Sequence, residues 1–161
     1  MAEQKTNVMR ILEQKKIPYQ AHSYPHGAGP VDGAAVARLL GQDPQQVYKT
    51  LVTRGHSRGI YVFVIPVLAT LDLKKAAKAA GEKSVEMIHV SEIAPLTGYV
   101  RGGCSPVGMK KRFSTFFDSA VEQLPTVMVS GGKIGWQVEV EPGALLKLVG
   151  AQIAPLTVPE A

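Results

Sequence analysis

Two runs of β-branched and aromatic residues constrain the fold of this chain more than any other feature. They cover residues 47–53 and 59–67, and the segment Arg54-Gly55-His56-Ser57-Arg58 separates them. Such residues favour strands, and a loop of this length is typical of a turn between antiparallel strands. The sequence therefore predicts a β-hairpin.

Hydrophobic periodicity and turn residues predict elements on both sides of this hairpin. Helices are expected over residues 6–15, 34–40, 73–80 and 142–149, with a further helical turn capped by Ser91. Further strands are expected over residues 17–24, 84–90, 112–117, 126–130 and 135–141. Hairpins that follow one another do not fit the strict alternation of strands and helices in a doubly wound fold. We expect one α+β domain over residues 1–161, with a mixed, mainly antiparallel sheet of about six or seven strands flanked by short helices.

Length and composition place the chain among ordinary globular proteins. A chain of 161 residues has room for one core, and its single cysteine, Cys104, cannot form an internal disulfide. Residues 1–16 are charged and lack the apolar core of a signal peptide. The longest apolar run, residues 60–71, is interrupted and too short to cross a bilayer. These features predict a cytoplasmic protein with no membrane span.

The charge balance favours an anionic partner such as nucleic acid. The formal net charge is +5 and the isoelectric point is near 9.4. Lys74 on one predicted helix, together with Lys110, Lys111 and Arg112 beside a glycine loop, could form a surface that follows phosphates. Solvated charged faces are the alternative interpretation of the same residues.

Familiar catalytic and cofactor motifs are missing from the sequence. It contains no phosphate-binding G-x-x-x-x-G-K-[ST] loop, no G-x-G-x-x-G, and no CxxC pair or HExxH element. The four histidines lack metal-ligand spacing. We therefore expect neither a metal nor a cofactor, and we interpret the lone Cys104 as a packing residue rather than a nucleophile.

Lys49 is the most informative charged residue of the hairpin. In a strand it shares a face with Val47, Leu51 and Thr53, so its ammonium is expected among apolar neighbours or at the mouth of a pocket. A lysine on an edge strand that reaches water is the alternative. The glycine pairs 102–103 and 131–132 could bring backbone amides close to a carbonyl oxygen or phosphate, although tight turns explain them equally well.

Five segments taken together resemble the YbaK family of bacterial Cys-tRNA(Pro) deacylases, and they occur in order over nearly the whole chain. They are residues 47–51 (VYKTL), 71–75 (LDLKK), 97–100 (TGYV), 102–106 (GGCSP) with Lys110-Lys111, and 129–133 (VSGGK). The resemblance implies a free-standing editing domain, similar to the insertion domain of prolyl-tRNA synthetase. It implies an enzyme that clears mischarged Cys-tRNA(Pro), with Cys-tRNA(Cys) as a further substrate.

The resemblance also implies a mechanism without a protein nucleophile. The thiol of the substrate cysteine attacks its own ester carbonyl, so the protein contributes orientation and charge stabilisation. Editing is needed because a synthetase pocket separates amino acids of similar size by only about 1–3 kcal/mol.

Site residues follow from the resemblance by position. Lys49 is expected near the terminal phosphate or the ester, the amides of Gly102 and Gly103 near the carbonyl oxygen, and Ser130 beside them. The expected substrate-binding residues are Tyr24, Thr50, Gln137, Val31 and Asp32. Two of these positions depart from the family: Gln137 replaces an aspartate, and the segment 29–33 offers Val31 or Asp32 in place of an aromatic residue.

Two other functions fit the same residues. One is an Ala-tRNA(Pro) deacylase that activates water, because alanine has no thiol. The other is a non-catalytic tRNA-binding module, for which Gln137 is the motivating feature. The expected partners are the aminoacylated acceptor end of tRNA and prolyl-tRNA synthetase, and the expected state is a monomer or a weak dimer.

Overall fold

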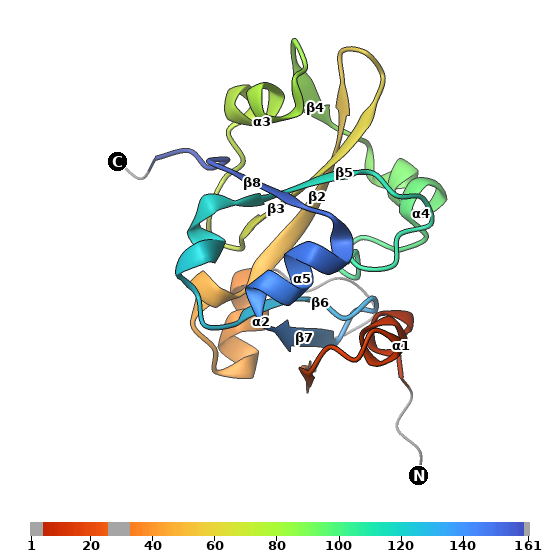
Figure 1. Ribbon diagram of the computed structural model, residues 1–161, viewed down its shortest axis with the longest axis vertical. Helices are drawn as coiled ribbons and strands as arrows, with labels where there is room; N and C mark the ends of the chain where they lie inside the picture. The colour runs from red at the N-terminus through yellow and green to blue at the C-terminus, as the bar shows by residue number, and fades with distance from the viewer. Residues whose placement is uncertain (1–4, 26–32, 160–161) are drawn as a thin grey trace.

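The strands of the computed structural model form two sheets, and the structure describes residues 5–25 and 33–159 (Figure 1). The smaller sheet has the order β1 (Tyr19–Ser23), β7 (Trp136–Val140), β6 (Val127–Ser130). The larger sheet has the order β4 (Val85–Met87), β2 (Tyr48–Gly55), β3 (Ile60–Pro66), β5 (Ser114–Asp118), β8 (Gln152–Ala154). Among the strand pairs of these two ranges, only β3–β5 and β5–β8 are parallel.

The predicted α+β class and the predicted hairpin are confirmed, whereas the strand count and the single sheet need correction. The described residues contain eight strands in two sheets, in place of about six or seven strands in one. The unpredicted strand, β8, has three residues and pairs only with β5. A segment this short carries too few residues for an alternation of apolar and polar positions, so its tertiary pairing decides its conformation.

Val47 joins the two sheets. It lies directly before β2, forms a parallel bridge with Met128 of β6, and its carbonyl accepts the amide of Val67 at 2.9 Å. Val47 is almost fully buried, in a small cluster with Ala37, Val67 and Met128. This cluster holds the first residues of β2 against the edge of the smaller sheet.

Five α-helices lie in the described ranges, and most begin and end where the sequence predicts. They are α1 (Asn7–Gln14), α2 (Gly33–Leu40), α3 (Leu73–Ala80), α4 (Val90–Thr97) and α5 (Pro142–Val149), with 3₁₀ turns η1 (Pro44–Gln46) and η2 (Ser119–Gln123). The predicted cap of α2, Asp32, lies outside the described residues. No helix of the described ranges has the length and apolar character needed to cross a bilayer.

Helix α4 is longer than the single turn that the sequence predicts, and it begins after His89 rather than Ser91. The Glu92 carboxylate accepts the backbone amide of His89 at 3.0 Å, which is half of a capping box. Pro95 lies inside the helix and obscures it in the sequence, because proline normally interrupts helices. The preceding strand, β4, is accordingly shorter than the predicted strand over residues 84–90.

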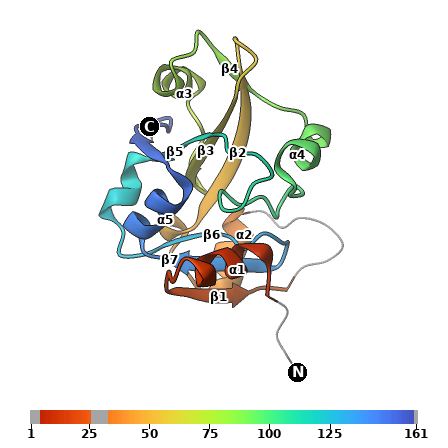
Figure 2. The same cartoon turned by 45° about the vertical axis from the view of Figure 1, so that its right-hand side comes forward.

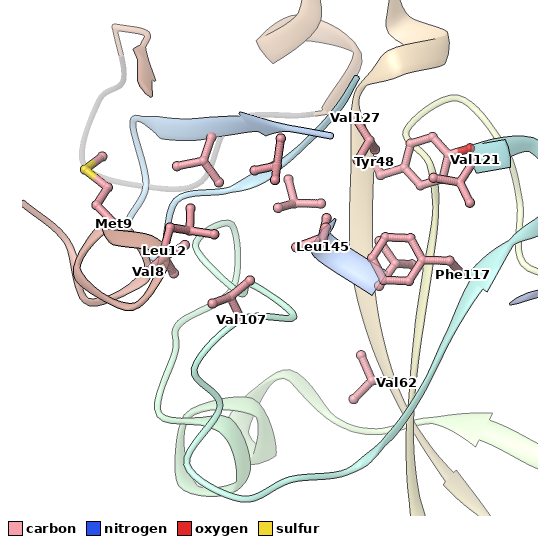
Figure 3. Packing of buried hydrophobic residues seen from close by; sticks show 14 of the residues in the cluster. Val8, Met9, Leu12, Tyr48, Val62, Val107, Phe117, Val121, Val127 and Leu145 are labelled. Carbon is pink, nitrogen blue, oxygen red and sulfur yellow. The ribbon is translucent and has the colours of Figure 1, made fainter. Parts of the chain in front are cut away.

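The main core fills the space between the sheets and two helices. Figure 3 shows Val8, Met9 and Leu12 of α1 on one side and Tyr48, Phe117 and Val121 on the other, with Leu145 of α5 between them. From the smaller sheet, the alternate residues Val127, Val129, Val138 and Val140 face this core. Their neighbours on β6 and β7 therefore face the opposite side of that sheet.

We expect Leu145→Ala to lower the free energy of unfolding by about 2–5 kcal/mol, because Leu145 is fully buried and its truncation leaves a cavity. Leu68→Ala is the matched control, since Leu68 is 63% exposed. Urea denaturation followed by circular dichroism measures both values. Equal stabilities for the two variants would contradict this description of the core.

Candidate active site

A cavity of about 450 Å³ lies at the junction that Val47 makes between the two sheets. Its volume falls in the range of small-molecule sites, about 300–1,000 Å³. Its polar lining comes from four separate parts of the chain: Tyr24 after β1, Lys49 and Thr50 on β2, Arg101, and Ser130 and Gln137 on β6 and β7. Val36 of α2 and Leu51 belong to its apolar lining.

Lys49 is held by the main hairpin. It pairs with Ile65 of β3 in the antiparallel ladder and is only partly exposed. Because Val47 fixes the start of β2 against β6, Lys49 lies on the wall of the cavity rather than at an open sheet edge. The structure thus agrees with a lysine at the mouth of a pocket, the first of the two sequence interpretations.

Thr50 and Gln137 present buried oxygen atoms to the same site. The Thr50 Oγ1 and Gln137 Oε1 atoms are inaccessible to solvent and make no hydrogen bond with any described residue. Leaving a buried polar atom without a partner costs about 1–3 kcal/mol, so such atoms are rare unless a ligand or water satisfies them. Thr50 and Gln137 both line the cavity, so a polar group bound there could satisfy these oxygens after a small turn of the side chains.

Ser130 and Gln137 are directly opposite each other in the β6–β7 ladder, so their side chains share a face. The Ser130 Oγ atom accepts the amide of Gly132 at 3.1 Å, which leaves its hydroxyl hydrogen for a ligand. Gly132 has φ +93°, and a Cβ atom there would lie 2.9 Å from Val8. The second glycine pair is therefore needed for the turn that positions Ser130 and Gln137.

The two glycines of the first pair, Gly102 and Gly103, have different roles. Gly102 lines the cavity, has φ +86°, and its amide has no hydrogen-bond partner within residues 5–25 and 33–159. The amide of Gly103 instead donates to the Val100 carbonyl at 3.0 Å. A Cβ atom on Gly103 would lie 3.1 Å from the Ile134 backbone nitrogen. The expected contact between the Gly103 amide and a substrate carbonyl therefore needs correction, because that amide is already used in a turn.

Cys104 lines the cavity as a protonated thiol. Burial raises its pKa to about 11, and a hydrogen bond with Thr97 opposes only part of this shift. The thiolate is the nucleophilic form, so a thiol with this pKa is inert near neutral pH. This environment agrees with the interpretation of Cys104 as a packing residue.

The structure does not bring the predicted phosphate-contacting residues together. Helix α3, which carries Lys74, and the segment of Lys110, Lys111 and Arg112 after α4 lie on opposite sides of the β2–β3 hairpin (Figures 1 and 2). Arg101, which the sequence analysis missed, is the cation that lines the cavity together with Lys49. Its place directly before Gly102 is the signal that could have identified it.

Two predicted substrate-binding residues, Val31 and Asp32, lie outside the described residues. The structure groups Tyr24, Lys49, Thr50, Gly102, Ser130 and Gln137 around one cavity. Within the described ranges, no three His, Cys, Asp or Glu side chains are close enough to hold a metal ion.

Comparison with known proteins gives the class to which this fold and this site belong. Residues 31–148 match the family model of the aminoacyl-tRNA editing domain, and the match includes every described polar residue of the cavity except Tyr24. The chain belongs to the aminoacyl-tRNA editing domain family.

Particular relatives agree with this family. A protein of Enterococcus faecalis, named as a candidate Cys-tRNA(Pro)/Cys-tRNA(Cys) deacylase, EbsC, is 45% identical over 98% of this chain and 96% of its own length. A crystal structure described as a candidate trans-editing enzyme for prolyl-tRNA synthetase is 27% identical, with a TM-score of 0.83 over 97% of this chain and all of that one. The crystal structure of a hypothetical protein is 25% identical, with a TM-score of 0.84 over 95% of this chain and all of that one.

We expect alkylation of Cys104 by iodoacetamide to accelerate with pH up to about pH 11, because the raised pKa keeps the thiol protonated below that value. In guanidinium chloride the same profile should level off near pH 8.5, the ordinary value for a thiol. Mass spectrometry measures the rates, and circular dichroism at each pH confirms that the protein is folded. A plateau near pH 8.5 for the folded protein would contradict the burial of this thiol.

Proposed function

We propose that this protein is a trans-editing deacylase that removes cysteine from mischarged Cys-tRNA(Pro), with Cys-tRNA(Cys) as a further substrate. Residues 1–161 act as one editing unit in the cytoplasm, as a monomer or a weak dimer. The observation that carries the proposal is the cavity that combines Lys49 with the buried, unpartnered oxygens of Thr50 and Gln137.

These groups match the chemistry of an aminoacyl ester. The α-ammonium of the amino acid is a strong hydrogen-bond donor, and the oxygens of Thr50 and Gln137 are acceptors for it. Lys49 and the Gly102 amide are donors for the ester carbonyl, whose oxygen becomes negatively charged during attack. Donors fixed in advance at this position stabilise the transition state, and one of them typically contributes about 2.7–4 kcal/mol.

The proposed reaction uses the thiol of the substrate. The thiol sulfur attacks the ester carbonyl of the same aminoacyl group and forms a C–S bond. The ester C–O bond breaks, and the thiol proton passes to the departing ribose oxygen. The products are a cyclic thioester and free tRNA, so no atom of the protein forms a covalent bond.

The described cavity wall favours this route over activation of water by a protein base. Among the described residues that line the cavity, none is Asp, Glu or His, the usual general bases. Cys104 is protonated at neutral pH and does not provide a nucleophile there. A substrate with its own nucleophile needs only the positioning and charge stabilisation that Lys49, Gly102 and Ser130 offer.

A second protein selects the tRNA. The cavity offers groups for the aminoacyl end, which is common to all tRNAs carrying the same amino acid. We propose prolyl-tRNA synthetase as the partner, since the related structure is described as a trans-editing enzyme for that synthetase. Such a partner would supply mischarged tRNA(Pro) directly.

We expect Lys49→Ala to reduce kcat for deacylation of Cys-tRNA(Pro) by about 100-fold or more, because it removes a charged donor from the cavity. Lys147→Ala is the matched control, since Lys147 is exposed on α5 and does not line the cavity. Loss of labelled cysteine from the tRNA measures both rates, and thermal denaturation checks that both variants are folded. Full activity in folded Lys49→Ala would refute the proposed role of this lysine.

A further inference from the structure

A second cavity, of about 360 Å³, adjoins the first one on the side of β4 and α4. The two cavities share Thr50, Leu51, Arg101, Gly102 and Cys104 as lining residues. The lining that belongs to the second cavity alone is entirely apolar: Val52, Met87, Ile88, Val90 and Ile93. The two cavities therefore have a common wall, and the second cavity adds only apolar side chains to it.

We propose that the second cavity binds the base of the nucleotide to which the amino acid is esterified. This inference rests on the proposed function for the identity of its ligand. The aminoacyl group and the base are attached to the same ribose, so they are separated by one sugar ring. When the aminoacyl group occupies the first cavity, the ribose lies at the shared wall, beside Leu51 and Gly102. The base then faces the second cavity.

The apolar lining suits the flat face of a base. The faces of a base are largely apolar, so they can pack against aliphatic side chains, and such packing tolerates different bases. Met87 and Val90 are 48% and 56% exposed and line the same cavity, so both are accessible to a ligand there. Since these residues offer no side-chain hydrogen bond to a base edge, we infer that the cavity binds purines with little discrimination.

The charges around the shared wall suit the phosphate of the same nucleotide. Arg101 is exposed and lines both cavities, so its guanidinium can bind a phosphate attached to a ribose at the wall. The nearby carboxylate of Glu92 on α4 is already paired with Arg54, at 2.7 Å, and with the His89 amide. This pairing reduces its repulsion of an anion.

Adenosine monophosphate and ribose 5-phosphate are the probes that test the inference, because the second compound lacks the base. In NMR titrations of the full chain, we expect adenosine monophosphate to shift the amide signals of Ile88, Val90, Ile93 and Gly102. Ribose 5-phosphate should leave those of Ile88, Val90 and Ile93 in place. Equal shifts from both probes, or shifts from adenosine monophosphate elsewhere only, would overturn the assignment.

Val90→Glu is the variant that blocks this cavity, because it introduces a carboxylate beside Arg101 and the base site. Val158→Glu is the matched control, since Val158 is 46% exposed and does not line either cavity. We expect Val90→Glu to weaken binding of adenosine monophosphate at least tenfold and Val158→Glu to leave it unchanged. Unchanged binding in a folded Val90→Glu protein would refute the inference.

Failure of the base site and failure of the proposed function give different results. Binding of adenosine monophosphate at Ile88 and Ile93 by a protein that does not deacylate Cys-tRNA would retain the base site and reject the proposed activity. Deacylation by a protein in which adenosine monophosphate shifts neither signal would retain the activity and reject the base site.

Discussion

The bridge between Val47 and Met128 is the contact on which the site depends. It holds the start of β2 against the edge of the smaller sheet, and the Val47 carbonyl is satisfied by Val67 at 2.9 Å. The main core packs the two sheets together, and this bridge brings Lys49 and Thr50 of the larger sheet to the same cavity as Ser130 and Gln137 of the smaller one. Val47 and Met128 are buried in one cluster with Ala37 and Val67, so the junction is packed.

The site combines a rigid frame with unsatisfied polar groups. Strands β2, β6 and β7 carry Lys49, Thr50, Ser130 and Gln137. Hydrogen bonds of the ladders therefore fix the backbone positions of these four residues. The unpartnered oxygens of Thr50 and Gln137 are costly in the unbound protein, and ligand binding would recover that free energy. Such an arrangement suits an enzyme that positions a reactive substrate instead of attacking it.

The sequence predicted much of the fold because its local signals agree with the tertiary structure. The bounds of α3 and α5 follow from Asp72 and Gly81, and from Pro142. It did not predict β8, which depends on pairing with β5, or the full length of α4, which Pro95 obscured. Resemblance to a known family identified six of the residues that line the cavity, whereas residue patterns alone could not distinguish them from ordinary strand and turn residues. The use of the Gly103 amide in a turn depends on how the loop at residues 100–104 folds, and for Arg101 the sequence offers only its position directly before Gly102 as a signal.

The most direct test of the proposed mechanism measures how fast the wild-type protein releases the amino acid from three substrates at the same concentration. They are Cys-tRNA(Pro), Ala-tRNA(Pro) and Pro-tRNA(Pro). The proposed mechanism predicts rapid loss of the amino acid from the cysteinyl substrate alone, with a cyclic thioester as the first product, because only that substrate carries a thiol. Faster loss from the alanyl substrate would contradict it, because alanine has no thiol and its removal needs water as the nucleophile.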